Sequence, residues 1–556
     1  MQDGIFSSPF PLNEHVYNYA PDCPETGALA LELARQGSEP VEIPLIIGGE
    51  EIRTGLMGEI RSPHNHKALL ATYHKASPAM VDMAAQKAVE SRAEWKRMPW
   101  EARAAIFLKA ADLLSTRFRQ KLNAATMLGQ SKNVYQAEID SACELIDFFR
   151  FNVHYARQIY ATQPEYNGER TWNRLEYRPL EGFVFAVTPF NFTSICGNLP
   201  TAPAMMGNTV VWKPASSAVL SNYYIMELLK EAGLPPGVIN FVPGDGASVG
   251  GPAIASRHFA GLHFTGSTST FNAMWVDIAN NLAANRYKVY PRIVGETGGK
   301  NFLIAHEDCD VQALAVALFR GAFEYQGQKC SATSRAYIPR SIWQKVRDKL
   351  VGFAESAAMG DVADFSTFMG AVIDKKAFRN IVSYIDYAKA KPDEYKFIVG
   401  GDCDDSEGWF IPATIIETNN PAGKLMSEEI FGPILTVYVY DSDKFDETLD
   451  LVDATSPFAL TGSIFANDRR VIEKMSDALS DCAGNFYIND KSTGAVVGQQ
   501  PFGGARASGT NDKAGSVFNL MRWTSVRTVK ENFLPAETWD YPHQRLPGYR
   551  EPKDIG

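Results

Sequence analysis

The sequence lacks the features that define several large classes of protein. No stretch of the 556 residues approaches the roughly 20 apolar residues that a membrane-spanning helix needs. The N-terminus has neither the basic and apolar segments of a signal peptide nor the arginines of a transit peptide. No His-Glu-x-x-His, Gly-x-Ser-x-Gly or Walker A pattern is present, so the residues give no support to a metalloprotease, a serine hydrolase or a kinase.

Cysteine is scarce, and its spacing is wide. The seven cysteines form no Cys-x-x-Cys pair and no Cys/His cluster with the spacing of zinc ligands. This spacing argues against a disulfide framework and a structural metal, and it predicts reduced thiols in a reducing compartment. We expect a cytoplasmic protein, with the mitochondrial matrix as the alternative if a presequence has been removed.

Positive charge does not dominate either. The chain has 54 lysines and arginines against 64 aspartates and glutamates, a net charge of -10. This balance argues against nucleic acid or an anionic membrane surface as the main partner. Hydrophobic residues make up 45% of the chain, which at this length is enough for two or three domains with filled cores.

The pattern of residues predicts an α/β fold. Residues 78–161 are rich in helix formers and begin with a proline after Ser77, as helices often do, so we expect several amphipathic helices there. After residue 181, short β-rich runs alternate with helical segments, which is typical of a doubly wound parallel sheet. The expected strands are residues 182–188, 209–213, 238–242, 261–265, 435–440 and 523–530.

Two segments carry residues suited to covalent catalysis followed by hydrolysis. Cys330 follows a flexible Gln-Gly-Gln stretch and the cation Lys329, which is expected to lower the pKa of the thiol. Glu296 lies in the string Gly-Glu-Thr-Gly-Gly-Lys-Asn of residues 295–301, where a carboxylate on a glycine-rich turn can activate a water. From the residues alone, a small buried cysteine and a surface glutamate remain the alternatives.

Polar groups also follow the ends of predicted strands. Asn191 comes after the strand at 182–188, where its amide and the backbone N–H of Cys330 would stabilise an oxyanion, although most loop asparagines are turn formers. Residues 264–268 end a strand at Gly266 and let Ser267 cap the next helix, whose positive end suits a pyrophosphate. The glycine-rich residues 244–250 equally fit a tight turn.

These segments, together with residues 428–434 (Glu-Glu-Ile-Phe-Gly-Pro-Ile), resemble the signature motifs of the aldehyde dehydrogenase superfamily, and the resemblance covers nearly the whole chain. It implies a nicotinamide cofactor, NAD, with NADP as the weaker alternative. Phe271 occupies a position where many relatives have glycine. The cofactor-binding residues implied are Thr188, Lys213, Ser216, Gly266, Ser267, Thr268, Ser269, Thr270, Glu429 and Phe431.

Residues 486–512, 148–152, 189–193 and 327–331 closely resemble the branch of that superfamily that oxidises L-glutamate γ-semialdehyde, formed from Δ1-pyrroline-5-carboxylate, to L-glutamate in proline breakdown. The resemblance implies that a backbone nest holds the substrate carboxylate. It also implies two rings that flank the methylene chain and a glutamate that faces the ammonium. The substrate-binding residues implied are Ser331, Gly494, Ala495, Lys329, Phe192, Phe502 and Glu144.

The resemblance also implies an architecture. We expect an N-terminal arm at residues 1–40, a Rossmann-like cofactor domain at 41–161 and 180–295, and a catalytic α/β domain at 296–485. A strand-rich bridging element and tail would occupy 162–179 and 486–556. This element contacts a neighbouring subunit in the superfamily, so we expect a homodimer or a larger homo-oligomer. The partners implied are a small-molecule substrate and, functionally, a separate proline dehydrogenase.

Two other functions compete with this interpretation. An aldehyde dehydrogenase of the acylating kind would pass the acyl group to coenzyme A instead of water, but such relatives typically lack a base at the position of Glu296. A non-catalytic structural protein on the same fold would not need a thiol, a base, an amide and cofactor residues together.

Overall fold

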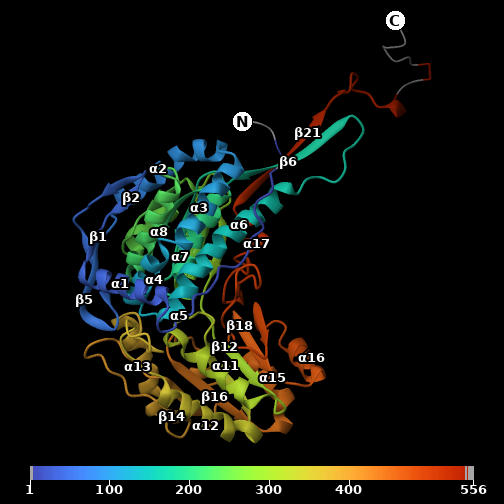
Figure 1. Ribbon diagram of the computed structural model, residues 1–556. Helices are drawn as coiled ribbons and strands as arrows, with labels where there is room; N and C mark the ends of the chain where they lie inside the picture. Colours follow the sequence, from blue (N-terminus) through green and yellow to red (C-terminus); the bar gives the residue numbers. More distant parts are fainter. Residues whose placement is uncertain (1–3, 5, 545–546, 549–556) are drawn as a thin grey trace.

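The computed structural model describes residues 4, 6–544 and 547–548. Two α/β lobes lie one above the other, and a two-stranded ribbon projects from the upper lobe (Figure 1). The expected α/β fold is therefore confirmed. No helix in the described part of the chain combines the length and the apolar character that crossing a membrane requires.

The upper lobe is built on a seven-stranded sheet with the order β11-β10-β7-β8-β9-β2-β3. Its central pairs are parallel, whereas β2 runs antiparallel to both β9 and β3. The strands are β2 Leu45–Ile47, β3 Glu50–Ile52, β7 Phe183–Val187, β8 Thr209–Lys213, β9 Ile239–Phe241, β10 Phe259–Thr265 and β11 Arg292–Glu296. The four strands expected between residues 182 and 265 are thus present; β2, β3 and β11 were not predicted.

Helices cover both faces of this sheet because successive strand residues point to opposite sides. Phe183 and Phe185 of β7 pack under one helical layer, whereas Val184 and Ala186 pack under the other. The first layer consists of α2 Pro78–Arg97, α9 Gly246–Ala255 and α10 Thr268–Ala283. The second consists of α3 Trp100–Ser115, α4 Arg119–Gln130, α6 Glu144–Ala161, α7 Thr193–Met205 and α8 Val219–Ala232.

The helical region expected at residues 78–161 ends where it was predicted, but it is interrupted. Ser131 has a φ of 59° and stops α4, and the short α5 Val134–Ala137 then leads into a π-helix, η1 Glu138–Cys143, directly before α6. Single π-turns inside helices often mark functional sites.

The lower lobe contains a second seven-stranded sheet, with the order β14-β15-β16-β13-β12-β18-β19. Its strands are β12 Asn301–Ala305, β13 Thr333–Pro339, β14 Tyr395–Val399, β15 Thr414–Thr418, β16 Ile434–Tyr440, β18 Thr461–Phe465 and β19 Asn485–Ile488. The sheet thus continues past residue 485, the expected edge of this domain. Helices α11 Val311–Phe323 and α12 Arg340–Ser356 cover one face; α13 Lys375–Lys389, α15 Phe445–Ala454 and α16 Arg469–Ala478 lie on the other.

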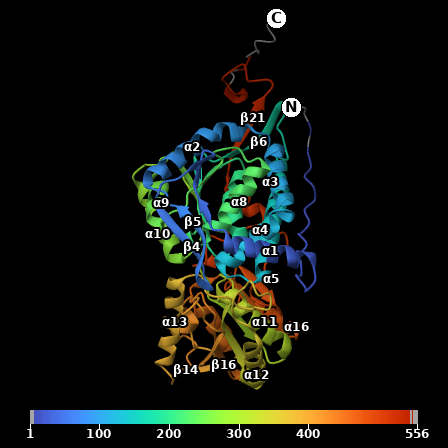
Figure 2. The same cartoon turned by 60° about the vertical axis from the view of Figure 1, so that its left-hand side comes forward.

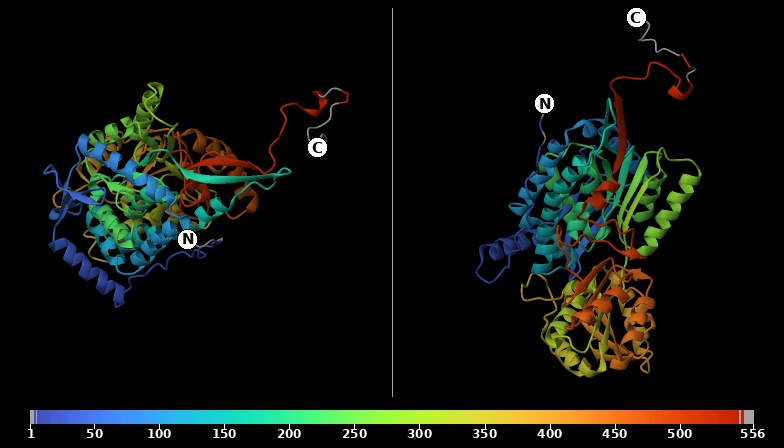
Figure 3. Two further views of the ribbon diagram at one scale, coloured as in Figure 1. Left: turned by 90° about the horizontal axis from the view of Figure 1, so that it is seen from above. Right: turned by 90° about the vertical axis from the view of Figure 1, so that its right-hand side faces the viewer.

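The ribbon joins two segments that are far apart in the sequence. Strand β6, Thr171–Pro179, pairs antiparallel with β21, Thr524–Asn532, in an unbroken register. Both strands extend away from the two lobes (Figure 3). Trp172, Val526, Phe533 and Leu534 are exposed on or next to it.

The remaining elements connect these parts. Figure 2 shows the N-terminal arm running along the outside of the helical layer to α1 Pro24–Ser38. The others are β1 Val41–Ile43, β4 Met57–Ser62, β5 Asn65–His74, η2 Ser216–Ala218, η3 Glu324–Gly327, α14 Lys424–Ser427, η4 Ser442–Lys444, β17 Phe458–Ala459, β20 Ala505–Arg506, α17 Val517–Arg522 and η5 Pro542–Gln544.

Candidate active site

The turn before Cys330 is held in an unusual backbone conformation. Tyr325, Gln326 and Gly327 all have positive φ, at 51°, 55° and 65°. Such strain persists only where neighbouring contacts enforce it. The Gln326 amide donates to the carbonyls of Ser131 (3.0 Å) and Ala371 (2.8 Å), and a Cβ on residue 327 would collide with the Gly432 carbonyl. The nucleophile candidate is therefore presented by a turn that is fixed from both lobes.

Asn191 and Asn301 flank this turn. The buried Asn191 side chain donates from Nδ2 to the carbonyl of Gln328 at 3.0 Å, two residues before Cys330. Asn301 donates from Nδ2 to the carbonyls of Cys330 (2.7 Å) and Ala332 (2.9 Å). Asn301 thus fixes the Cys330 backbone, and Asn191 brings a second amide N–H to the same loop.

Cys330 is partly exposed, but its thiol is in a poor environment for ionisation. Burial, together with the nearby carboxylates of Glu296 and Glu429, raises the pKa of Cys330 to about 12, although the backbone N–H groups of Cys330 and Ser331 act in the opposite direction. The expectation that Lys329 lowers this pKa is wrong. The Lys329 ammonium instead lies 3.6 Å from Asp140 Oδ2 and 3.5 Å from Glu324 Oε2.

Glu296 ends β11 and turns toward the loop at residues 503–504. Its Oε2 accepts a hydrogen bond from the backbone N–H of Gly504 at 3.1 Å. Burial raises the pKa of Glu296 well above its ordinary value, while that N–H and the Lys513 ammonium act in the opposite direction. Lys513 donates to the carbonyls of Gly484 (2.6 Å) and Gly503 (3.0 Å), which holds the loop in place. A carboxylate with a raised pKa can accept a proton near neutral pH.

The expected substrate nest lies beside the nucleophile loop. Ser331 Oγ shares a 2.7 Å hydrogen bond with Thr493 Oγ1, and Ser492 Oγ donates to the Ser331 carbonyl at 2.9 Å. Gly494 follows with a φ of 105°. Within the described residues, the backbone N–H groups of Gly494 and Ala495 have no protein acceptor. They can therefore donate to an anion.

Two charged residues that the sequence did not single out, Lys132 and Asp140, lie close to Phe192 and Lys329. Lys132 is buried, contacts Asp140 Oδ2 at 2.5 Å, and places its ammonium 4.2 Å from the Phe192 ring. Lys329 lies 5.9 Å from the same ring. No motif marks Lys132 or Asp140 in the sequence; Asp140 lies on the π-helix, and Lys132 lies between α4 and α5.

Glu144, the first residue after the π-helix, faces the same cluster. Its Oε2 accepts a 2.5 Å hydrogen bond from Ser194 Oγ. Burial and the charge of Asp140 raise the pKa of Glu144 to about 8, although Ser194, Lys132 and Lys329 oppose this. A substrate ammonium would shift this pKa downward. Phe502, by contrast, exchanges two backbone hydrogen bonds with Ala514, which orients its segment.

The residues expected to bind a cofactor line the end of the upper sheet. Ser267 caps α10, accepting from the Thr270 N–H at 3.3 Å, next to Gly266 and Ser269. Lys213 at the end of β8 is buried, and burial lowers its pKa to about 8. Two further expected residues lie here: Thr188 accepts from the Trp212 indole at 3.0 Å, and Ser216 begins η2.

Thr268 and Glu429 connect this turn to the catalytic loop. The Gly298 N–H donates to Thr268 Oγ1 at 3.2 Å, and the Gly299 N–H donates to Glu429 Oε1 at 2.9 Å. A Cβ on residue 298 would collide with the Glu429 carboxylate, so any larger residue there has to displace that side chain. Phe431, with a φ of 58°, packs edge-on against Phe190.

These groups fit a dinucleotide. The N-terminus of α10 suits a pyrophosphate, and Glu429 and Lys213 suit ribose hydroxyls. Phe271 is buried against Phe264 and fills the space above Gly295, so it packs behind the turn. The described residues contain no group of three histidine, cysteine or acidic side chains that could hold a metal ion.

Comparisons with known proteins agree with this geometry. A model of the aldehyde dehydrogenase family matches residues 54–529. The mitochondrial Delta-1-pyrroline-5-carboxylate dehydrogenase of Dictyostelium discoideum is 55% identical over 535 residues, 96% of each chain. The crystal structure of the Delta-pyrroline-5-carboxylate dehydrogenase from Mycobacterium tuberculosis bound with NAD has a TM-score of 0.94 and 50% identity, covering 98% of this chain and 100% of that chain.

A larger protein is similar as well. Proline utilization A (PutA) from Bdellovibrio bacteriovorus, in a crystal structure of the form inactivated by N-propargylglycine, has a TM-score of 0.89 and 30% identity. The match covers 95% of this chain and 54% of that chain. Each of the three similarities to individual proteins therefore extends over nearly all of this sequence.

Proposed function

Because the chain belongs to the aldehyde dehydrogenase family, we propose that it oxidises L-glutamate γ-semialdehyde, formed from Δ1-pyrroline-5-carboxylate, to L-glutamate with NAD. The observation that carries the substrate assignment is the pair of free N–H groups at Gly494 and Ala495, beside the Ser331–Thr493 hydrogen bond. A carboxylate bound there would direct the aldehyde end of a short substrate toward Cys330.

Covalent attack begins at Cys330. Its Sγ forms a bond to the aldehyde carbon as the thiol proton passes to solvent water. The aldehyde oxygen becomes an oxyanion, and the Asn191 amide and the Cys330 backbone N–H stabilise it. The product of this step is a hemithioacetal. NAD, when bound, supplies the hydride acceptor that converts this adduct to a thioester.

Glu296 then completes the reaction. Its raised pKa lets the carboxylate take a proton from a water as that water attacks the thioester carbon. The bond between Cys330 Sγ and the acyl carbon breaks, Glu296 returns the proton to the departing sulfur so that the thiol is restored, and glutamate leaves. On the substrate side, Phe192 and Phe502 flank the methylene chain, and Glu144, with Lys329 and Lys132 nearby, balances the charge of the α-amino group.

The cofactor is held by residues of both lobes. Gly266, Ser267, Ser269 and Thr270 present the N-terminus of α10 to the pyrophosphate. Lys213, Thr188 and Ser216 face the adenosine half, and Glu429 and Phe431 face the nicotinamide half. Thr268 connects the adenosine side to the nicotinamide side, because it accepts a hydrogen bond from Gly298, the neighbour of the Gly299 that donates to Glu429. We propose NAD as the preferred cofactor and NADP as the weaker alternative.

The proposal extends to the oligomeric state, the cellular compartment and the source of the substrate. The exposed apolar residues of the β6–β21 ribbon support a homodimer or larger homo-oligomer. The free thiols of the described cysteines fit the cytoplasm or the mitochondrial matrix, and the Dictyostelium relative carries "mitochondrial" in its name. The substrate requires an enzyme that oxidises proline, which we place on a separate chain.

A substrate panel tests this function. NADH formation is measured with pyrroline-5-carboxylate, succinic semialdehyde, glutaric semialdehyde and propanal, each with and without coenzyme A. We expect a preference for pyrroline-5-carboxylate and no stimulation by coenzyme A. Activity only on another aldehyde would overturn the substrate assignment, and dependence on coenzyme A would favour the acylating alternative.

A further inference from the structure

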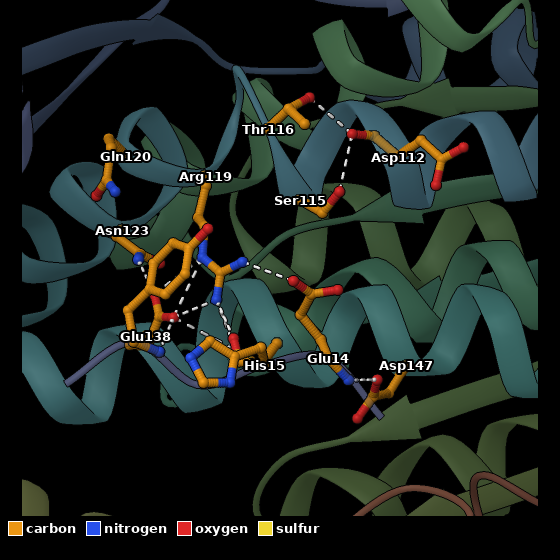
Figure 4. A network of polar contacts seen from close by, with 12 residues as sticks. Glu14, His15, Asp112, Ser115, Thr116, Arg119, Gln120, Asn123, Glu138 and Asp147 are labelled. Carbon is orange, nitrogen blue, oxygen red and sulfur yellow. Dashed lines mark hydrogen bonds and ion pairs between the residues drawn. The ribbon is translucent and has the colours of Figure 1, made fainter. Parts of the chain in front are cut away.

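The N-terminal arm, residues 6–23, precedes the family-matched region at residues 54–529, yet it is anchored by buried charge. Arg119 donates to Glu14 Oε1 at 2.7 Å and to the His15 carbonyl at 2.5 Å, and it also pairs with the fully buried Glu138 (Figure 4). The Tyr17 N–H donates to Glu138 Oε1 at 2.9 Å. Glu138 is the first residue of the π-helix that leads to Glu144.

Asn13 connects this arm to two elements at once. Its Nδ2 donates to Asp147 Oδ2 on α6 at 2.7 Å and to the Val497 carbonyl at 2.8 Å. Its Oδ1 accepts from Gln499 Nε2 at 2.9 Å. The Glu14 N–H donates to Asp147 Oδ1 at 2.7 Å, which fixes the backbone beside Asn13. All the polar atoms of the Asn13 side chain are therefore used, and two of these three bonds reach the same loop.

That loop, residues 492–501, is the substrate loop, because it contains Gly494 and Ala495. Its first residues are tied to the nucleophile loop through Ser492 and Thr493. Residues 494–500 have no such hydrogen bonds to the nucleophile loop in the described structure. Among the residues that the structure describes, the only hydrogen bonds that they make outside their own loop are those to Asn13.

The loop also needs an external support on conformational grounds. Gly494 and Gly498 have φ values of 105° and 84°, and glycine loses more backbone freedom on ordering than any other residue. Val497 is buried and Gly498 approaches the Phe151 ring, but these apolar contacts do not fix the direction of the N–H groups. The Asn13 side-chain amide, which joins the loop to α6, does fix that direction.

We propose that Asn13 is a positioning residue for the substrate loop, and that the N-terminal arm thereby sets the affinity for the carboxylate end of the substrate. This inference rests on the proposed function. Asn13 does not touch the substrate; it acts through Val497 and Gln499, which hold the Gly494 and Ala495 N–H groups in one orientation. An aldehyde without a carboxylate does not use those groups and is indifferent to the arm.

The test uses the full chain with Asn13→Ala and, as its matched control on the same arm, Asn18→Ala. Asn18 is exposed, and its Oδ1 accepts from the Ala20 N–H and the Cys23 thiol, both within the arm. KM and kcat are measured for pyrroline-5-carboxylate, for propanal and for NAD. Because Asn13→Ala removes two bonds to the loop, we expect KM for pyrroline-5-carboxylate to rise about tenfold. The constants for propanal and NAD should not change, and Asn18→Ala should match the wild type.

Gln499→Ala separates positioning from folding, because it removes one loop bond and leaves the arm attached to Asp147. It should raise KM for pyrroline-5-carboxylate less than Asn13→Ala does. Equal losses on propanal and pyrroline-5-carboxylate in Asn13→Ala would show a purely structural role and overturn the proposal, as would an unchanged KM. Failure of the wild type to oxidise pyrroline-5-carboxylate, with propanal still oxidised, would instead refute the proposed function.

Discussion

The reactivity of Cys330 depends on ionisation of its thiol, and the nearby negative charges oppose that ionisation. Burial and the carboxylates of Glu296 and Glu429 raise the pKa of the thiol to about 12, so the resting side chain keeps its proton. A thiolate therefore forms only when a base takes that proton. Lys329, the residue before Cys330, does not promote this ionisation, because its ammonium is paired with Asp140 and Glu324.

Lys513 should tune the general base. Its ammonium stabilises the charged form of Glu296 and holds the Gly503–Gly504 turn, so removing it raises the pKa of Glu296 further. We expect Lys513→Met to move the acidic limb of the kcat–pH profile to higher pH, because the carboxylate is then deprotonated only at higher pH. Lys513→Arg keeps the charge and should leave the limb near its wild-type position. A Met variant with the wild-type profile would remove Lys513 from this account.

Gly298 should control cofactor affinity through steric exclusion. A Cβ at this position would collide with Glu429, which holds the Gly299 N–H, so Gly298→Ala must displace that carboxylate. We expect KM for NAD to rise by about tenfold or more. Gly251→Ala is the matched control, since its Cβ would meet nothing within 4 Å. The idea fails if both variants bind NAD like the wild type in a fluorescence titration.

For single residues, the sequence predicted where the side chains of the site lie better than it predicted the charges around them. Residue strings placed Cys330, Glu296 and Asn191 on loops, and the structure brings these loops together. The buried pair Lys132–Asp140 could not be predicted, because its acid lies on a π-helix that no sequence pattern announces. The direction of the Lys329 side chain could not be predicted either, since Asp140, which is far away in the sequence, and Glu324 together decide it.

Among the elements, the turn before Cys330 is bound to its neighbours through one buried acid. Glu324 in η3 contacts Lys491 at 2.8 Å, Arg320 at 2.9 Å and Lys329 at 3.5 Å. Burial alone would raise the pKa of Glu324, but the lysines and the arginine prevail and lower it to about 2. The carboxylate thus joins η3, α11 and the start of the substrate loop.

Glu324 should make the protein sensitive to acid. A carboxylate whose pKa falls from 4.5 to about 2 on folding stabilises the fold above pH 4.5, and this stability is lost as the pH falls toward 2. Glu324→Gln should lower the free energy of unfolding at pH 7 by about 3 kcal/mol, because buried cations lose their partner. It should also remove this part of the acid dependence, as measured by urea unfolding across pH. Glu447→Gln breaks an exposed pair with Lys444 and should have little effect; equal losses in the two variants would contradict the argument.

Element prediction succeeded where periodicity and caps were clear. The strands at residues 183–187 and 209–213 are short, largely apolar runs between turn residues, as buried parallel strands are, and Ser267 caps α10 as expected. Strands β2 and β3, with three residues each, have too little pattern to be recognised. Their place in the sheet depends on pairing with β9, nearly 200 residues away by the Ile46–Phe241 register.

For the whole molecule, the most conspicuous surface feature is the set of exposed apolar side chains on the β6–β21 ribbon. Trp172, Phe533 and Leu534 are 52%, 57% and 61% exposed on or beside a ribbon that stands away from both lobes. Large exposed apolar groups of this kind mark protein contacts. We infer that they pack against another copy of the chain.

Charge placed on the ribbon should dissociate the assembly. We expect the wild type to sediment as a dimer or larger oligomer, and the double variant Trp172→Asp/Phe533→Asp to sediment as a monomer with its circular dichroism unchanged. Leu31→Asp is the matched control, because Leu31 is an exposed apolar residue of α1. A double variant that sediments like the wild type would place the subunit contact elsewhere.

The central claim is that Cys330 carries the acyl group and Glu296 releases it. The most direct test is mass spectrometry of Glu296→Gln quenched after mixing with pyrroline-5-carboxylate and NAD, followed by proteolysis to locate the adduct. The mechanism predicts a glutamyl thioester on the peptide that contains Cys330, no such adduct in Glu296→Gln/Cys330→Ala, and an undiminished adduct in Glu296→Gln/Cys403→Ala. Rapid turnover by Glu296→Gln without an adduct, or an adduct on another cysteine, would contradict it.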